Sequence, residues 1–180
     1  MRNDLLWEPV VRHAIGSSSP LDEPSKERYR SMLKLVSRNQ EGTAATDFTY
    51  TLADGSQGRL YDISAPYTII FFYNPDCGEC ARTKAQMEAS GYLDMLHNVG
   101  LVKVLALYPD GDVSAWRKAL PQNPERWISA YDKEQKINRE GLYDLKAIPT
   151  LYLLDAQKRV IMKDPLVEVL ISFLASEFCG

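Results

Sequence analysis

Hydrophobic residues change their spacing along the chain near residue 47. Before that point they recur three and four positions apart in two segments, separated by a polar break at 16–20, which predicts two helices. Ser25 is the expected N-cap of the second helix, which has Leu33 and Val36 on its apolar face. We expect both helices to pack on the main domain, with dimerisation or partner docking as the alternative.

After residue 47 the hydrophobic runs are shorter and rich in β-branched and aromatic residues. The run at 68–73 is apolar without interruption, as expected of a central strand buried on both faces. Asp54-Gly55 is a turn signal that places the strand before it in a hairpin or at an edge. The other expected strands are 48–52, 101–107, 127–130, 150–154 and 159–162, and the expected helices are 77–90, 92–97, 113–120, 137–145 and one at the C-terminus with its stripe at 167–174.

This order of elements predicts an α/β fold in which helices flank a mixed sheet. We divide the chain into a helical N-terminal extension, residues 1–45, and one domain, residues 46–180. With 180 residues, 45% of them hydrophobic, and a net charge of −3, the composition fits one soluble domain with an appendage. The chain lacks the basic patches that binding to nucleic acid requires, so no nucleic-acid partner is expected.

Membrane and targeting signals are also missing from the sequence. The longest apolar run, residues 67–73, is far shorter than the roughly 18 residues that suggest a membrane span. The first residues carry no apolar stretch of the kind that a signal peptide needs. Because a targeting segment can be trimmed from a chain, a cytoplasmic location is one alternative among others.

The three cysteines are too few for a disulfide scaffold, so their spacing is more informative than their number. Cys77 and Cys80 stand two residues apart, directly after the buried strand and at the start of a helix. There the backbone N–H groups and the helix dipole stabilise a thiolate at Cys77, and Cys80 lies one turn away. Such a pair can exchange disulfides, with Cys77 as the nucleophile and Cys80 as the resolving thiol. Cys179 is expected to be an unpaired tail residue.

A structural zinc site and an inert buried pair are the alternatives for these two cysteines. Zinc takes four ligands, usually supplied as two pairs, and the sequence has no second pair. His13 and His97 are isolated from the cysteines and from each other. We therefore expect neither a metal ion nor a bound cofactor.

A proline at the entry to a later strand is the second feature that bears on function. Pro149 follows Ile148 there, and a proline at the first residue of a strand has a purely structural explanation. The alternative is a cis peptide bond between Ile148 and Pro149, which would present the Ile148 backbone to a substrate peptide beside Cys77.

Residues from about 45 to 178 resemble the thioredoxin superfamily, most closely its TlpA/ResA-like branch of bacterial extracytoplasmic thiol–disulfide oxidoreductases. The residues that carry the resemblance are Asp47-Phe48-Thr49, Asp54-Gly55, the segment from Phe71 to Cys80, Trp116, and Ile148-Pro149-Thr150-Leu151. The resemblance implies a thioredoxin-like mixed sheet, a cis-proline at Pro149, a nucleophile at Cys77 and a resolver at Cys80. It also implies a periplasmic or membrane-anchored extracytoplasmic location.

The chain departs from the family pattern at four positions around this site. Asp76 replaces the aromatic residue before the first cysteine, and Phe71 stands where thioredoxin has a buried acid. Thr83 replaces an acidic residue, and Ala85 replaces a proline that kinks the helix. Trp116 is expected to pack in the core rather than to contact a substrate.

Two acidic residues beside the nucleophile are expected to tune its pKa. Asp76 and Glu79 flank Cys77 and raise the cost of its thiolate, against the helix dipole, while Arg82 and Lys84 lie a turn or more away. A destabilised thiolate favours the disulfide form, so we expect a reducing protein.

The leading hypothesis is therefore a disulfide reductase that acts on protein disulfides and receives electrons from an upstream dithiol donor. The alternative is a non-catalytic thioredoxin-like module that uses the N-terminal helices for docking.

Overall fold

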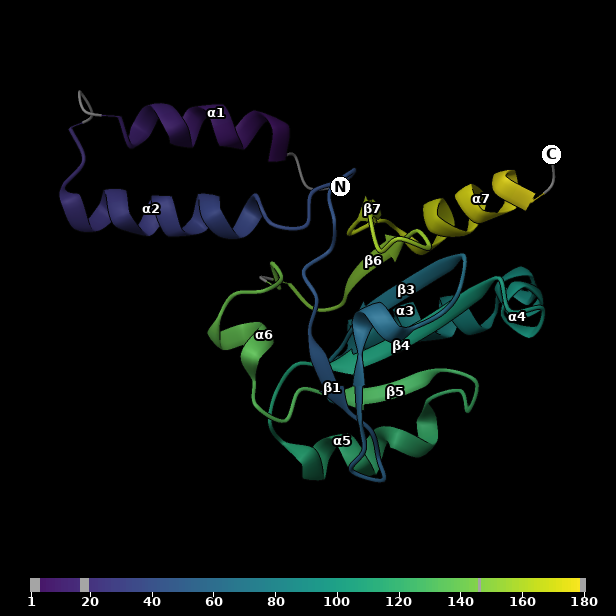
Figure 1. Cartoon of the computed structure of the whole chain (residues 1–180). Coiled ribbons are helices and arrows are strands. Elements are labelled where there is room, and N and C mark those ends of the chain that lie inside the picture. Colours follow the sequence, from purple (N-terminus) through teal and green to yellow (C-terminus); the bar gives the residue numbers. More distant parts are fainter. Residues whose placement is uncertain (1–3, 17–19, 146, 179–180) are drawn as a thin grey trace.

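A seven-stranded sheet forms the centre of the computed structural model, which describes residues 4–16, 20–145 and 147–178 (Figure 1). Cys179 lies outside the described residues, so its expected unpaired state stays a prediction. The strand order is β2-β1-β5-β4-β3-β6-β7. The strands are β1 (Thr49–Thr51), β2 (Gln57–Arg59), β3 (Tyr67–Phe72), β4 (Val102–Tyr108), β5 (Ile128–Tyr131), β6 (Thr150–Leu154) and β7 (Val160–Lys163).

The sheet is mixed, as the order of elements predicted. β3, β4 and β5 run parallel, whereas β6 lies antiparallel to β3 and β1 antiparallel to β5. The predicted hairpin before the core is present, because β1 pairs with β2 in antiparallel register around the turn at Asp54-Gly55. β3 lies between β4 and β6, which places the uninterrupted apolar run in the middle of the sheet.

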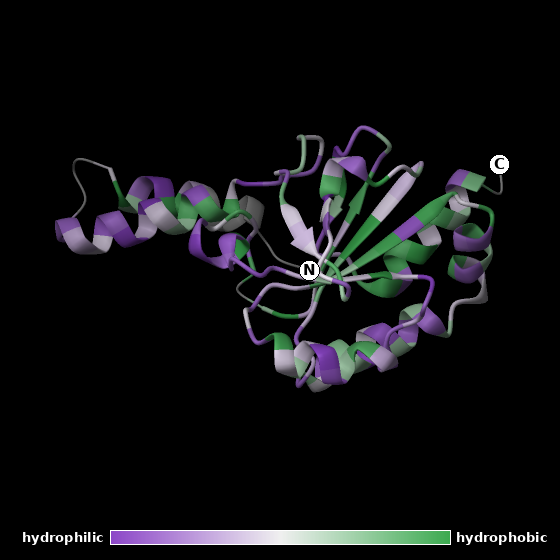
Figure 2. Cartoon of the chain, turned by 60° about the horizontal axis from the view of Figure 1, so that its bottom comes forward, coloured by the Kyte–Doolittle hydropathy of each residue, from purple (hydrophilic) through white to green (hydrophobic). Residues whose placement is uncertain are grey.

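Alternate residues of β3 supply the two hydrophobic cores on opposite faces of the sheet. Ile69 and Phe71 belong to one core, while Ile70 and Phe72 belong to the other. All four side chains are fully buried. Figure 2 shows largely hydrophobic strands at the centre of the molecule and helices of mixed hydropathy around them. Burial on both faces explains why the strand has no polar alternation.

Helices cover the sheet and form a separate N-terminal pair. They are α1 (Asp4–Ala14), α2 (Glu23–Val36), α3 (Gly78–Glu88), α4 (Gly91–Asn98), α5 (Val113–Ala119), α6 (Lys136–Arg139) and α7 (Val167–Phe178), with short 3-10 turns η1 (Leu60–Asp62) and η2 (Leu120–Gln122). α3, α4 and α7 pack against one another and share one of the two cores. The C-terminal stripe is confirmed at Val167, Leu170 and Leu174, which are buried.

The N-terminal helices differ from the expectation that both lie on the main domain. α1 packs against α2, and the pair projects from the sheet as an arm (Figures 1 and 2). The arm is anchored at its base, where Lys163 Nζ donates to the carbonyl oxygen of Val36 at 2.7 Å and Asn39 Nδ2 donates to that of Leu142 at 2.8 Å. The end of α2 is therefore fixed to the domain, while α1 is held mainly by its neighbour.

Two predicted helix boundaries are wrong for local reasons. Asp22, not Ser25, is the N-cap of α2, because its carboxylate accepts the backbone N–H of Ser25 at 3.2 Å. The helix expected at 137–145 is only the single turn α6. Gly141 ends it with a φ of 55°, a left-handed conformation that glycine adopts without steric cost.

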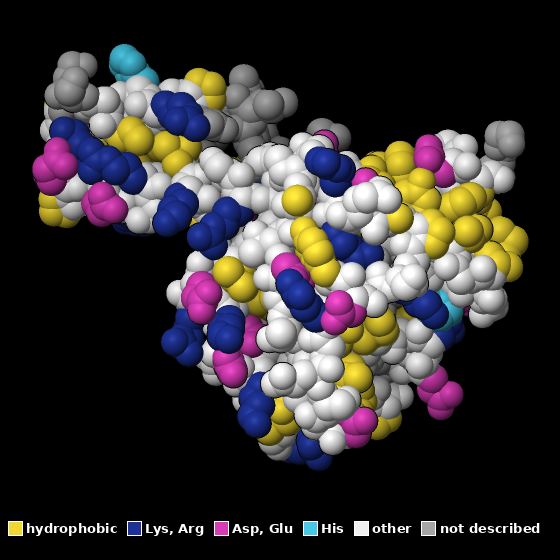
Figure 3. Space-filling view, viewed as in Figure 1, with side chains coloured by type: hydrophobic (Ala, Val, Ile, Leu, Met, Phe, Trp, Pro, Cys, Tyr) yellow, Lys and Arg dark blue, Asp and Glu magenta, His cyan; other side chains and the backbone are white. Residues whose placement is uncertain are grey.

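No helix within the described part of the chain is long and apolar enough to cross a membrane. Figure 3 shows lysine and arginine side chains interspersed with acidic ones over the arm and the body, so the visible face carries no single-sign patch.

Candidate active site

The turn after β3 places Cys77 at the start of α3. Asn74 builds this turn: its side-chain oxygen accepts the backbone N–H of Asp76 at 2.9 Å, and its carbonyl oxygen accepts that of Cys77 at 3.1 Å. A side chain that bonds the backbone two residues on is the usual way in which asparagine stabilises a turn. The chain thus leaves the central strand and enters the helix within a few residues, with Cys77 as the N-cap.

Cys77 occupies the position where backbone N–H groups point out of the helix. Its Sγ accepts the N–H of Cys80 at 3.2 Å, which is the N-cap interaction of α3. The side chain is half-buried, so it remains open to a reaction partner. Negative charge on this sulfur is favoured by the donated hydrogen bond and by the positive end of the helix dipole.

Cys80 is the inner thiol of the pair. It is only 3% exposed, and its Sγ accepts the backbone N–H of Asn74 at 3.5 Å. Burial, and after it the hydrogen bond with Cys77, raise the pKa of the Cys80 thiol to about 12. Cys80 therefore keeps its proton near neutral pH, which suits a thiol that reacts second.

The strand entry at Pro149 lies beside the cysteine pair. The peptide bond between Ile148 and Pro149 is cis. The carbonyl oxygen of Ile148 lies 3.6 Å from Cys77 Sγ, and Thr150 Oγ1 donates to the carbonyl oxygen of Ala147 at 2.5 Å. The structure thus brings together Cys77, Cys80, Ile148 and Pro149, which come from widely separated parts of the sequence.

The two acidic residues beside Cys77 differ in their surroundings. Glu79 forms an ion pair with Arg82, and both side chains are about two-thirds exposed, at 65% and 67%. Arg82 contacts Glu79 because residues three apart in a helix are neighbours. Asp76 is exposed, and together with Asp110 and Asp112 it adds to the rise in the pKa of Tyr108, whose main cause is burial. The tuning of Cys77 by Asp76 and Glu79 stays a prediction.

Three residues near the site were not identified from the sequence as functional. Asn74 builds the turn, and the only signal for it was its position before a proline. Tyr73 and Asn123 are buried, at 4% and 8% exposure, and Asn123 Nδ2 donates to the Tyr73 hydroxyl at 3.0 Å. Nothing in the local sequence links two residues so far apart. Trp116, by contrast, is fully buried against Tyr131, with ring centroids 4.7 Å apart, which confirms its expected role in the core.

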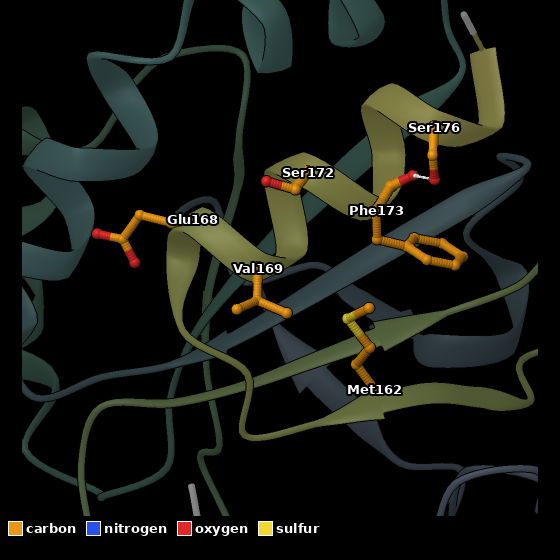
Figure 4. Close-up of a pocket in the computed structure, with 6 residues that line it drawn as sticks. All are labelled: Met162, Glu168, Val169, Ser172, Phe173 and Ser176. Atoms are coloured by element: carbon orange, nitrogen blue, oxygen red, sulfur yellow. Dashed lines mark hydrogen bonds between the residues drawn. The ribbon is translucent and has the colours of Figure 1, made fainter. Parts of the chain in front are cut away.

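Neither metal coordination nor the apolar groove beside α7 offers a competing site within the described residues. No group of three or more histidine, cysteine or acidic side chains within residues 4–16, 20–145 and 147–178 is placed to hold a metal ion. An apolar groove of about 460 Å³ lies between β7 and α7 (Figure 4). Its lining residues are Met162, Glu168, Val169, Ser172, Phe173 and Ser176. It contains no thiol, so it cannot carry disulfide chemistry.

We compared the chain with protein families, curated proteins and solved structures. No protein-family model and no curated protein matches the chain. A thioredoxin-like protein from Bacteroides caccae is 40% identical, with a TM-score of 0.92 over 97% of this chain. This chain spans only 63% of that protein's length.

Two further structures match about three-quarters of the chain. The C-terminal domain of an uncharacterized protein from Bacteroides fragilis is 42% identical over 76% of this chain and 98% of its own, with a TM-score of 0.74. The thioredoxin domain of a thiol-disulfide oxidoreductase from Bacteroides vulgatus is 16% identical over 77% of this chain and 97% of its own, with a TM-score of 0.67. At 16% identity, the likeness to the Bacteroides vulgatus domain shows a shared fold alone.

The arm is part of the first match, because an alignment over 97% of the chain includes both of its helices. The sheet order, the cysteine pair at the start of α3 and these likenesses agree with the resemblance derived from the sequence. The chain belongs to the thioredoxin superfamily.

Proposed function

We propose that this protein is a thiol–disulfide oxidoreductase that reduces protein disulfides through Cys77 and Cys80. One observation carries the proposal: the half-exposed Cys77 sulfur accepts a helix N–H, while the thiol of Cys80 beside it is buried and protonated. Exchange needs this asymmetry, because one sulfur must attack and the other must wait.

The reaction follows from the two positions. The Cys77 thiolate attacks one sulfur of a substrate disulfide, and the other substrate sulfur leaves with the electron pair of the broken bond. Cys80 then loses its proton and attacks Cys77, which forms the Cys77–Cys80 disulfide and releases the second substrate thiol. Two electrons pass from the protein to the substrate, and an upstream dithiol donor must return them.

The strand entry supplies the surface for the substrate chain. The Ile148 backbone lies beside Cys77, so an extended peptide that runs past Pro149 would bring its sulfur to the nucleophile. Asp76 and Glu79 add negative charge near Cys77, which favours the oxidised protein and hence the reductase direction. Protein disulfides form and persist mainly outside the cytoplasm, so we propose an extracytoplasmic location for the protein.

Reduction of insulin by the protein with dithiothreitol as the donor tests the proposal. We expect activity that Cys77→Ser abolishes and that Cys179→Ser, the matched loss of the third thiol, leaves intact. Equal activity of the protein and of Cys77→Ser would contradict the proposal. That result would favour a binding module that docks through the projecting arm.

A further inference from the structure

Release of the Cys80 proton is the step for which the cysteine pair itself provides no acceptor. The thiol is 3% exposed, and the one hydrogen bond that its sulfur receives from outside the pair comes from a donor, the N–H of Asn74. A proton acceptor for the resolving step must therefore approach Cys80 from the side of the thiol that faces the protein interior. This question arises only if the proposed exchange reaction takes place.

A small cavity of about 30 Å³ lies directly against Cys80. Its volume is enough for one water molecule, which needs roughly 10–15 Å³ by the same kind of measure. The polar residues that line it besides Cys80 come from three parts of the chain: Tyr73 and Asn74 follow β3, Lys84 belongs to α3, and Gln122 and Asn123 lie after α5. Gln122 is exposed, so the cavity extends to the protein surface.

The hydrogen bonds around this cavity leave suitable groups for a water molecule. Asn123 Nδ2 donates to the Tyr73 hydroxyl at 3.0 Å and to Ser129 Oγ at 3.2 Å, so both of its hydrogens are used. Oδ1 of Asn123 remains as an acceptor. The Tyr73 hydroxyl accepts from Asn123 and keeps its own proton for another partner. Two buried polar groups beside Cys80 can thus orient a water molecule.

Phe71 also lines the cavity, at the position where the resemblance to thioredoxin places a buried acid. The strand itself therefore supplies no carboxylate near Cys80. Tyr73 and Asn123 provide polar atoms in the same space from the end of the strand and from a distant segment.

We propose that a water molecule in this cavity accepts the Cys80 proton during resolution, and that Tyr73 and Asn123 are positioning residues that hold it. The Cys80 S–H bond breaks, and the sulfur uses its electron pair to bond to Cys77. The bond between Cys77 and the substrate sulfur breaks, and that sulfur leaves with its electron pair and takes a proton from solvent. The proton on the cavity water passes to bulk solvent beside Gln122.

The titratable and charged groups around Cys80 and Tyr73 are few. Cys77 faces Cys80, Tyr108 faces Tyr73, and Lys84 lines the cavity, where Nζ donates to the carbonyl oxygen of Gln122 at 2.8 Å.

The two steps can be separated with dithiobis(2-nitrobenzoate) in a Cys179→Ser background, which removes the third thiol. The attack by Cys77 releases one nitrothiobenzoate, and the attack by Cys80 releases the second. We expect Tyr73→Phe and Asn123→Ala to slow the second release about tenfold at pH 7, less than the roughly 10²–10⁴-fold that a direct general base provides. The rate of the first release should be unchanged. The difference between variant and parent in the rate of the second release should shrink as pH rises, because hydroxide then removes the Cys80 proton.

Tyr108→Phe is the matched control, because it removes a neighbouring tyrosine hydroxyl that does not line the cavity. Both of its releases should keep the parent rates. A second release in Tyr73→Phe within about twofold of the parent would overturn the proposal. If both releases slowed equally and the slowing did not depend on pH, the proposal would also be overturned, because that result indicates a structural role. The proposed function fails separately if the parent shows no second release, or if that release persists in Cys80→Ser.

Discussion

The burial of Cys80 predicts that alkylating reagents discriminate strongly against it in the folded, reduced protein. Its pKa of about 12, against an ordinary value of 9.0, sets the magnitude. At pH 8 about one ordinary thiol in ten is ionised but only about one Cys80 in ten thousand, a thousandfold difference. A thiolate is more nucleophilic when the pKa of its thiol is higher, by roughly twentyfold for a rise of three in pKa. The net effect is a reaction about fiftyfold slower, before steric protection slows it further.

The experiment compares iodoacetamide modification of Cys80 in the folded and the urea-unfolded protein at pH 8. Peptide mapping by mass spectrometry with isotope-coded reagent gives the rate for each cysteine. Cys80 in the unfolded chain is the internal reference, because its burial is then lost. We expect at least about fiftyfold protection on folding. Protection of less than about threefold would refute the assignment of Cys80 as the buried, protonated thiol.

The Cys80 proton, the buried Asp132 and the acidic residues beside Cys77 each give a further prediction. Because the folded protein holds the Cys80 proton above pH 9.0 and the unfolded chain releases it, the contribution of Cys80 to the stability of the reduced protein is complete below pH 9 and is lost as pH rises toward 12. Urea unfolding at pH 10 should show a loss of about 1.4 kcal/mol relative to pH 7, absent from the Cys80→Ala profile. Asp132→Ala should lower the free energy of unfolding by about 1–3 kcal/mol, since the buried carboxylate accepts the N–H of Ile137 at 2.7 Å. Asp132→Asn keeps an acceptor and should lose less, and equal losses would contradict this. Asp76→Asn should raise the reduction potential, measured against glutathione, more than Glu79→Gln, because an arginine already pairs with Glu79; the opposite order would count against the role of Asp76.

The sequence predicted those parts of the fold whose cause is local. The run at 68–73 became the central strand because every position is apolar and both faces of the sheet are covered. Cys77 became an N-cap because a turn-forming asparagine and a proline stop the strand just before it. The proximity of Pro149 to Cys77 was predicted from the pattern of motifs that the chain shares with a known family.

Apart from the Asp22 cap, what the sequence did not predict involves contacts between distant segments. The helix expected at 137–145 stops after one turn at Gly141, where the carbonyl oxygens of the loop accept hydrogen bonds from the base of the arm. The pairing of α1 with α2 could not be deduced, because an apolar helix face packs equally well on a sheet or on another helix. The bond between Tyr73 and Asn123 joins segments fifty residues apart, and neither has a local signal for it.

Trapping of a mixed disulfide tests the central claim most directly. In the Cys80→Ser protein the resolving thiol is missing, so Cys77 should remain joined to its substrate after reaction with insulin. The account predicts an adduct that mass spectrometry maps to Cys77, that dithiothreitol releases, and that Cys77→Ser does not form. An adduct in the Cys77→Ser protein at the rate seen in Cys80→Ser, or no adduct in either, would contradict the assignment of Cys77 as the nucleophile.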